Sequence, residues 1–321
     1  MTAPDLLMPA PMAPAVIAAL EGRFRLHRLW EQDDREAFLA NIGPRIRGMA
    51  ASPAIGRVDA ALLDRLPALE IIASFGVGYD YVDATAAAKR RVVVTNTPGV
   101  LDDEVADLTI GLLLSTIRRI PQADRFLRDG RWRDGVFPLS PTLRGRRIGI
   151  VGLGHIGKAI ARRLDGFGVA ISYHARHRQA DIGYAYYDSA VALAEASDVL
   201  IVIVPGGAAT RYLIDAAVLR ALGPDGVLIN VSRGSVVDTA ALIDALQAGT
   251  IMAAGLDVYE DEPNVPDALV ALDNTVLLPH IGSASVETRA AMGQLVVDNL
   301  VSWFGGKGAV TPVAETRSLV A

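Results

Sequence analysis

The stretch Gly149-Ile150-Val151-Gly152-Leu153-Gly154-His155-Ile156-Gly157 decides the fold, because it joins an apolar strand, a glycine-rich turn and the start of an amphipathic helix. In a Gly-x-Gly-x-x-Gly turn the first glycine permits the tight turn, the second lets the backbone approach a pyrophosphate, and the third lets helix and strand pack closely. The N–H groups that open such a helix attract phosphate. The stretch therefore predicts a dinucleotide-binding domain, with cofactor contacts at Gly152, Leu153, Gly154, His155, Ile156 and Gly157.

Apolar runs of strand length alternate with helix-like runs through most of the chain. After residue 146 the predicted strands are Ile148–Val151, Ala170–Tyr173, Val199–Val204, Gly226–Val231, Met252–Asp257 and Thr275–Leu278. Before residue 98 they are Leu6–Met8, Phe24–His27, Ile46–Met49, Ile71–Phe75 and Val92–Thr95. This alternation predicts doubly wound α/β units with parallel sheets. The length of 321 residues suggests about two domains.

Between these two groups of strands lies a different pattern. Residues 103–118 are predicted as a helix that is apolar nearly all round, which is typical of burial between domains or subunits. A polar and aromatic loop is expected from Ala123 to Leu143, and its length indicates an excursion onto a partner or over a site. Its Trp132 and Phe137 either line a substrate pocket or pack in an interface. We expect a homodimer from the helix and the loop together.

The composition excludes several classes of function. A net charge of −5 argues against nucleic acid as a partner, because phosphate backbones require a basic surface. The absence of cysteine excludes disulfides, thiolate metal sites and cysteine nucleophiles, and we expect no bound metal. No apolar run is long enough to cross a membrane, and the first residues lack a signal-peptide pattern. We therefore expect a cytoplasmic protein with a small-molecule substrate.

The choice between the two nicotinamide dinucleotides depends on the end of the second strand of the domain. A site that prefers NAD usually has Asp or Glu there, which binds the ribose hydroxyls. Here the strand is followed by His174-Ala175-Arg176-His177-Arg178, which contains no carboxylate. Arg176 is able to clamp a 2′-phosphate, assisted by His177 or Arg178, with His174 beside the ribose. We predict a preference for NADP(H), with NAD(H) possible; the alternative is that these are solvated loop charges.

A proton donor for carbon–oxygen chemistry is sought among five histidines. Four of them lie in the glycine turn, near the ribose or early in the chain. The fifth, His280, follows a predicted strand, and ligands of open parallel sheets bind at the carboxyl ends of strands. Arg233 and Glu262 also follow strands in this half. A carboxylate beside the histidine would orient its ring, and an arginine would hold a carboxylate or polarise a carbonyl. The pattern alone does not show that the three side chains meet.

Six segments together resemble the D-isomer-specific 2-hydroxyacid dehydrogenases, the family that includes formate, glycerate and phosphoglycerate dehydrogenases. The segments are Phe75-Gly76-Val77-Gly78-Tyr79-Asp80, Asn96-Thr97-Pro98-Gly99-Val100-Leu101, the Gly152 turn, Asn230-Val231-Ser232-Arg233-Gly234, Gly255-Leu256-Asp257-Val258-Tyr259 with Glu262-Pro263, and Pro279-His280-Ile281-Gly282. They follow the order of that family and cover most of the chain. The stretches Gly130-Arg131-Trp132, Phe137-Pro138-Leu139 and Tyr173-His174-Ala175-Arg176 are most similar to the hydroxypyruvate, glyoxylate and hydroxyphenylpyruvate reductases.

The resemblance implies two Rossmann-like domains with the site in the cleft between them. Residues 1–100 and 286–321 would form a flavodoxin-like substrate domain, and residues 101–285 the NAD(P)-binding domain. Family members often have Pro-Leu-Thr in the loop after the strand at Val199. This chain instead has Pro205-Gly206-Gly207-Ala208-Ala209-Thr210. We therefore expect cofactor contacts from that loop only at Pro205 and Thr210.

The resemblance also implies roles for single residues. It implies Arg233 as the substrate clamp, His280 as the acid–base and Glu262 as the partner that orients it. It implies that Asp257 holds the nicotinamide carboxamide, and that the N–H groups of Val77 and Gly78 receive the substrate carboxylate. Further cofactor contacts are expected at Val231, Ser232, Arg233, His280 and Gly282. Taken singly, each has a structural alternative: Arg233 as a cap on a carboxylate, Glu262 as a turn residue and Asp257 as an acceptor for backbone amides.

The activity implied is the NADPH-preferring reduction of a 2-oxo acid to the D-2-hydroxy acid. The side chain of the substrate stays open, since glyoxylate, hydroxypyruvate and the bulkier phenylpyruvate all fit the pattern. The alternative from another class is a non-catalytic dinucleotide sensor that binds protein partners, as corepressor relatives in this family do.

Overall fold

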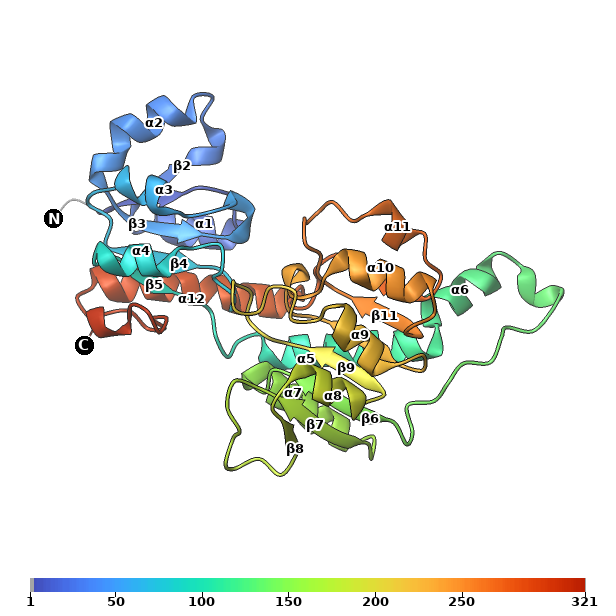
Figure 1. The fold of residues 1–321 in the computed structure, drawn as a ribbon. Helices are drawn as coiled ribbons and strands as arrows, with labels where there is room; N and C mark the ends of the chain where they lie inside the picture. The colour runs from blue at the N-terminus through green and yellow to red at the C-terminus, as the bar shows by residue number, and fades with distance from the viewer. Residues whose placement is uncertain (1–2, 321) are drawn as a thin grey trace. The chain divides into compact units, whose positions relative to one another are not determined.

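The computed structural model describes residues 3–320 and divides into two compact units. Unit 1 consists of Met1–Leu101 and Ser285–Ala321, and unit 2 of Asp102–Ala284. Each unit is a parallel sheet with helices on both faces (Figure 1). The expected fold class, two doubly wound α/β domains, is confirmed.

The sheet of unit 1 has five parallel strands in the order β2-β1-β3-β4-β5, which is the flavodoxin-like order. The strands are β1 (Asp5–Met8), β2 (Arg25–Arg28), β3 (Ile46–Ala51), β4 (Ile71–Ser74) and β5 (Val93–Thr95). On one face pack α1 (Pro14–Glu21) and α12 (Val286–Phe304). On the other pack α2 (Arg35–Ile42), α3 (Ala60–Asp64) and α4 (Ala84–Lys89). The chain therefore leaves this unit after β5 and returns to it with α12.

The sheet of unit 2 has seven parallel strands in the order β12-β11-β10-β9-β6-β7-β8. They are β6 (Arg147–Val151), β7 (Ala170–His174), β8 (Ala185–Tyr187), β9 (Val199–Val202), β10 (Val227–Asn230), β11 (Ala253–Leu256) and β12 (Thr275–Leu277). The order reverses between β6 and β9, so the glycine turn that follows β6 lies at the topological switch point, where such sheets bind ligands. The short edge strand β8 was not among the predicted strands; the other six are found where expected to within two residues.

Helices cover both faces of this second sheet. On one face lie α8 (Ala190–Glu195), α9 (Ala216–Leu222) and α10 (Thr239–Gln247), and on the other α5 (Asp102–Arg118) and α7 (His155–Asp165). The apolar helix expected at 103–118 is α5. Its Leu112, Leu113 and Ile117 are buried against β10, β11 and α7 of the same unit. A short helix, α11 (Asp267–Val270), precedes β12.

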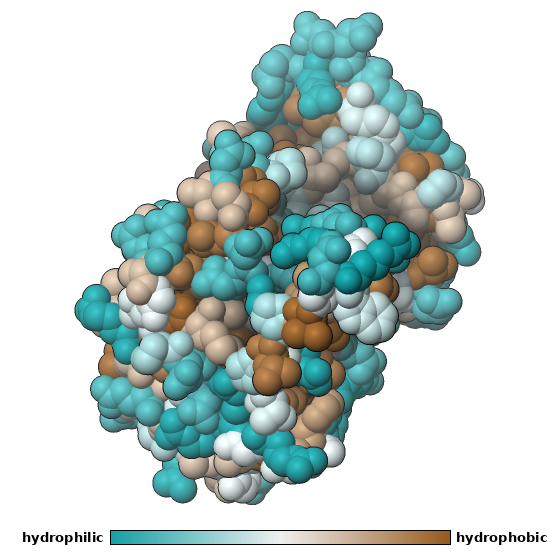
Figure 2. All heavy atoms as spheres, turned by 90° about the vertical axis from the view of Figure 1, so that its right-hand side faces the viewer, coloured by the Kyte–Doolittle hydropathy of each residue, from teal (hydrophilic) through white to brown (hydrophobic). Residues whose placement is uncertain are grey.

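The prediction of a loop at 123–143 is partly wrong, because α6 (Ile120–Arg128) occupies the first part of this segment. Pro121 stands in the first turn of the helix, where proline is tolerated, and Asp124 pairs with Arg128 at the favourable i,i+4 spacing. A 3-10 turn (Arg131–Arg133) and irregular chain follow. The segment exposes Trp132 and Leu139, and the face on which α6 projects shows apolar side chains among hydrophilic ones (Figure 2). Of the helices in the described part of the chain, none is long and apolar enough to cross a membrane.

Candidate active site

The three motif glycines of unit 2 have the three separate roles that their spacing predicts. Gly152 has a φ of +102°, and a Cβ built on it would lie 2.2 Å from the carbonyl oxygen of Ile203. A Cβ on Gly157 would lie 2.2 Å from the carbonyl oxygen of Gly152. Both positions therefore exclude a side chain for reasons of the fold. A Cβ on Gly154 would meet nothing within 4 Å, so the absence of a side chain there leaves room beside the turn.

The room beside Gly154 fits a dinucleotide pyrophosphate. Gly154 is the N-cap of α7, and no side chain caps this helix end. The N–H groups of its first turn and the positive end of its dipole are arranged as in anion-binding turns. His155, the first residue of the helix, is exposed, and its Nδ1 lies 3.9 Å from a carboxylate oxygen of Asp102. The residues present therefore fit the group that the motif predicts.

The loop after β7 carries the residues expected at the adenosine ribose. Arg176, His177 and Arg178 are exposed and form no ion pair with any other residue in the range 3–320. His174 differs from them, because its Nδ1 donates to the carbonyl oxygen of Tyr187 at 3.0 Å and ties β7 to β8. Of the residues expected here, Arg176, His177 and Arg178 are therefore the ones whose side chains a 2′-phosphate would be able to reach.

The loop after β9 brings together the two residues expected to act there. The hydroxyl of Thr210 donates to the carbonyl oxygen of Pro205 at 2.7 Å and closes the loop. Gly207, between them, has a φ of +128°. Thr210 therefore fixes the shape of this loop, and its contact with the cofactor stays a prediction.

Arg233 stands in a turn that a buried asparagine builds. Asn230, 1 % exposed at the end of β10, accepts from the backbone N–H and the hydroxyl of Ser232 and donates to the carbonyl oxygen of Arg233. The side chains of Val231 and Ser232 are buried, so these residues offer a ligand their backbone. A Cβ on Gly234 would lie 1.8 Å from the backbone carbon of Tyr259. Glycine at this position therefore lets the Arg233 turn approach the segment that carries Glu262.

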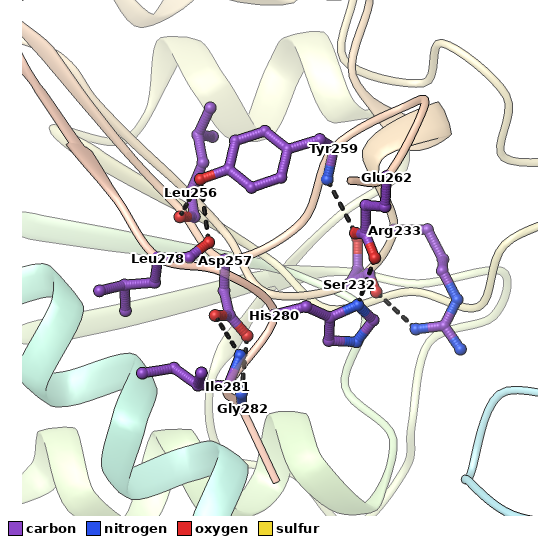
Figure 3. Close-up of polar contacts among 10 residues, drawn as sticks. All are labelled: Ser232, Arg233, Leu256, Asp257, Tyr259, Glu262, Leu278, His280, Ile281 and Gly282. Atoms are coloured by element: carbon purple, nitrogen blue, oxygen red, sulfur yellow. Dashed lines mark hydrogen bonds and ion pairs between the residues drawn. The ribbon is translucent and has the colours of Figure 1, made fainter. Parts of the chain in front are cut away.

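Glu262 and His280 form a close pair (Figure 3). Nδ1 of His280 donates to Oε2 of Glu262 at 2.6 Å, and Oε1 of Glu262 accepts the backbone N–H of Tyr259 at 3.0 Å. Burial alone would raise the pKa of Glu262, but these hydrogen bonds, with the nearby charge of Arg233, outweigh it and lower the pKa. The carboxylate therefore stays ionised and holds Nδ1, which leaves Nε2 of the ring to a substrate.

The backbone of His280 has an unusual conformation, and its ring is partly exposed. Its φ is +54°, in the left-handed region that few non-glycine residues adopt. The side chain is 44 % exposed although it follows a buried strand. Tyr259 supports this corner, because its hydroxyl donates to the carbonyl oxygen of Leu278 at 2.9 Å. Burial and the charges of Asp257 and Glu262 raise the pKa of Tyr259 to about 12, so this donor keeps its proton.

Asp257 stabilises the backbone that follows His280. Its two carboxylate oxygens accept the N–H groups of Ile281 at 2.7 Å and Gly282 at 2.8 Å (Figure 3). Burial raises the pKa of Asp257, and the two N–H bonds oppose that rise. The carboxylate therefore acts as an acceptor for backbone amides, and a contact with the nicotinamide carboxamide would use its remaining lone pairs.

In unit 1, the Val77–Gly78 turn that follows β4 is held by side chains from beyond β5. The amide of Asn96 donates to the carbonyl oxygen of Val77 at 2.9 Å, and the hydroxyl of Thr97 accepts the N–H of Gly76 at 3.1 Å. Gly76 has a φ of +136°, which the turn requires. These bonds give the turn a defined shape.

Three residues that support the site were not among the predicted ones: Asn230, Tyr259 and Gln179. The first two stand inside the recognised segments. For Asn230 the available signal was a polar residue at the end of an otherwise apolar strand. Gln179 had no such signal, because its side chain donates to a backbone carbonyl oxygen, that of Leu153, twenty-six residues away. Among residues 3–320, no group of three or more histidine or acidic side chains is arranged to hold a metal ion.

Comparison with known proteins decides the family. The model of the D-isomer specific 2-hydroxyacid dehydrogenase NAD binding domain matches residues 110–282. The chain is 47 % identical over 313 residues to hydroxyphenylpyruvate reductase of Plectranthus scutellarioides, covering 98 % of this chain and 100 % of that one. The chain belongs to the D-isomer-specific 2-hydroxyacid dehydrogenase family. It is thus an oxidoreductase with a domain for a nicotinamide dinucleotide.

Further members of the family are similar over nearly the whole chain. A glyoxylate/hydroxypyruvate reductase of Arabidopsis thaliana is 45 % identical over 308 residues, covering 96 % of this chain and 98 % of that one. The crystal structure of NADPH-dependent glyoxylate/hydroxypyruvate reductase from Sinorhizobium meliloti in complex with NADP and malonate matches with a TM-score of 0.93 and 55 % identity. It covers 98 % of each chain. The family resemblance predicted from the six segments is confirmed.

Proposed function

We propose that this dehydrogenase reduces a small 2-oxo acid to the D-2-hydroxy acid and prefers NADPH. The observation that carries the proposal is the 2.6 Å pair of Glu262 and His280 at the carboxyl edge of the sheet that bears the glycine turn. Relatives named as glyoxylate/hydroxypyruvate and hydroxyphenylpyruvate reductases support it. A non-catalytic sensor loses support, because these relatives are reductases and Arg233, Glu262 and His280 are all present.

The cofactor would be held by the glycine turn and by the loop after β7. Its reduced nicotinamide supplies the hydride. The open space at Gly154 suits the pyrophosphate, and the exposed side chains of Arg176, His177 and Arg178 suit a 2′-phosphate. The NADP-bound relative from Sinorhizobium meliloti supports this assignment.

The protein residues would supply the proton and the substrate contacts. Nδ1 of His280 is engaged by Glu262, so Nε2 is the atom that gives a proton to the developing alkoxide oxygen. Arg233 would bind the substrate carboxylate through its guanidinium. The expected role of the N–H groups of Val77 and Gly78 as donors to a carboxylate stays a prediction. Glu262 would keep the ring oriented through the proton transfer.

We also propose a homodimer that uses the segment from α6 to residue 143. Within this segment Trp132 is 67 %, Val136 86 % and Leu139 99 % exposed. Contiguous exposed apolar side chains are typical of protein–protein contact sites. Sedimentation of the wild type and of Leu139→Asp would test it, with a dimer that dissociates in the variant as the supporting result.

A kinetic panel tests the activity. Glyoxylate, hydroxypyruvate and phenylpyruvate, each with NADPH and NADH, should give the largest kcat/KM with NADPH and one of the first two substrates. The largest value with phenylpyruvate would assign the bulkier substrate class, and no consumption of either cofactor would refute a reductase. The cytoplasmic location expected from the composition stays a prediction that cell fractionation would test.

A further inference from the structure

The loop that carries Arg176–Arg178 is fastened to the glycine turn by its next residue, Gln179. The side-chain amide of Gln179 donates to the carbonyl oxygen of Leu153 at 2.7 Å. Leu153 lies between the first two motif glycines, so this bond joins the adenosine side of the site directly to the pyrophosphate side. Gln179 is half-buried, whereas Arg176, His177 and Arg178 before it are exposed.

Two tyrosines anchor the same loop to the sheet. The hydroxyl of Tyr173, whose side chain is fully buried on β7, accepts the backbone N–H of Gln179 at 2.9 Å. The hydroxyl of Tyr186 on β8 donates to the carbonyl oxygen of Ala175 at 3.3 Å. The rings of Tyr173 and Tyr186 pack against each other with centroids 5.4 Å apart. The loop is therefore held at both ends of the Arg176–Arg178 stretch.

This arrangement matters for a ligand with two separate phosphate groups. An exposed arginine loses side-chain entropy when it binds, and a loop that moved would add a further cost. A loop fixed relative to the glycine turn presents its cations at a constant distance from the pyrophosphate. Pre-organisation of this kind raises affinity without a contact of its own to the ligand.

We propose that Gln179 is a positioning residue for the 2′-phosphate of NADP(H), acting through the loop Arg176–Arg178 and its bond to Leu153. Its role is to favour NADP(H) over NAD(H), since only the former has a group for that loop to bind. The inference rests on the proposed preference for NADPH.

Gln179→Met tests the proposal, because methionine keeps the length and volume of the side chain and removes its donor. We expect the dissociation constant for NADP⁺, measured by calorimetry, to rise about two- to tenfold, the range for one hydrogen bond. The constant for NAD⁺ should change less than about twofold, because NAD⁺ has no 2′-phosphate for the loop to bind, and the effect should appear in the KM for NADPH more than in kcat. Gln294→Met, which removes an exposed amide donor from α12 in unit 1, should change neither constant.

A double-mutant cycle with Arg176→Ala separates positioning from general damage to the loop. If Gln179 acts through Arg176, its substitution should weaken NADP⁺ binding little once Arg176 is gone. Equal losses for NADP⁺ and NAD⁺, or additive losses in the cycle, would overturn the role of Gln179 and leave the cofactor preference standing. A wild type that binds NADP⁺ no more tightly than NAD⁺ would overturn both.

Discussion

At the catalytic end of unit 2 the functional side chains bond to one another, whereas at the adenosine end they point into solvent. His280 bonds to Glu262, which in turn accepts a backbone N–H. Arg176, by contrast, is exposed and has no ion-pair partner in the described chain. Both ends follow strands of one sheet, so the fold does not dictate the difference.

The difference indicates two ways of using charge. Proton transfer requires an imidazole ring that is held in one orientation. The hydrogen bond from Nδ1 of His280 to Glu262 holds the ring in this way before the substrate arrives. Recognition of a phosphate requires cations that no carboxylate already neutralises. We therefore expect substitutions at the catalytic end to lower turnover and substitutions at the adenosine end to change cofactor choice.

The largest effect is expected from His280→Ala. Loss of the general acid should lower kcat for 2-oxo acid reduction by a factor of about 10²–10⁴. Steady-state rates with NADPH and hydroxypyruvate would measure it, with thermal unfolding as the check that the fold is intact. A loss of turnover of less than about threefold would be too small for the removal of a general acid. Such a result would exclude His280 as the proton donor.

Glu262→Gln should have the next largest effect. The amide keeps the shape but not the charge, so we expect kcat to fall about 10- to 100-fold, as for a hydrogen bond to a charged group. The matched control is Glu260→Gln, two residues away, whose carboxylate pairs with Arg211. Equal losses in the two variants would show that charge in this segment, rather than the bond to His280, is what matters.

Glu262 also gives a pH dependence of known sign. Its pKa is lowered in the folded protein, so its ionised form stabilises the fold above the ordinary glutamate pKa, and the stability is lost as the pH falls through the lowered value. The melting temperature of the wild type should therefore exceed that of Glu262→Gln near pH 6 and approach it as the medium becomes more acidic. A difference that grew on acidification would contradict the sign.

Within the glycine turn, Gly154→Ala should weaken NADPH binding without loss of stability, whereas Gly157→Ala should lower the stability of the fold. Alanine at 154 meets no protein atom, so the melting temperature should hold while the added methyl weakens NADPH binding, by about five- to a hundredfold if the clash costs roughly 1–3 kcal/mol. Alanine at 157 collides with the backbone of Gly152, so the melting temperature should fall. Calorimetric binding and thermal unfolding of both variants check this; unchanged NADPH binding in Gly154→Ala would mean that the pyrophosphate lies elsewhere.

The smallest effect is expected from Arg176→Ala. The kcat/KM with NADPH should fall about tenfold, since one charge-assisted contact at an exposed site is lost. The value with NADH should change less than about twofold, because there is no 2′-phosphate to hold. Arg220→Ala, an exposed arginine of α9, serves as the control. Parallel losses with both cofactors would assign Arg176 to the fold.

Local patterns were sufficient to predict the glycine turn, the residues that follow β10, β11 and β12, and every strand except β8. They succeeded because a buried parallel strand is a continuous apolar run, and ligand contacts gather where such runs end. The meeting of Glu262 with His280, eighteen residues apart, depends on how β11 and β12 pair, and local pattern does not contain that pairing. The resemblance to a family supplied it.

The missed features have identifiable causes. The pattern does not predict the helix α6, because none of its side chains is fully buried and Pro121 stands at its start, so no buried apolar stripe marks it. The strand β8 is three residues long and never fully buried, so it lacks the apolar run. Gln179 acts through a carbonyl oxygen twenty-six residues away, and a backbone acceptor leaves no mark in the sequence.

The enantiomer of the product tests the central claim most directly. Incubation of the wild type with NADPH and hydroxypyruvate, followed by chiral separation of the glycerate formed, reports the reaction, the cofactor and the stereochemistry at once. The account predicts consumption of NADPH with formation of D-glycerate. L-glycerate, or no consumption of NADPH with hydroxypyruvate or any other 2-oxo acid, would contradict it.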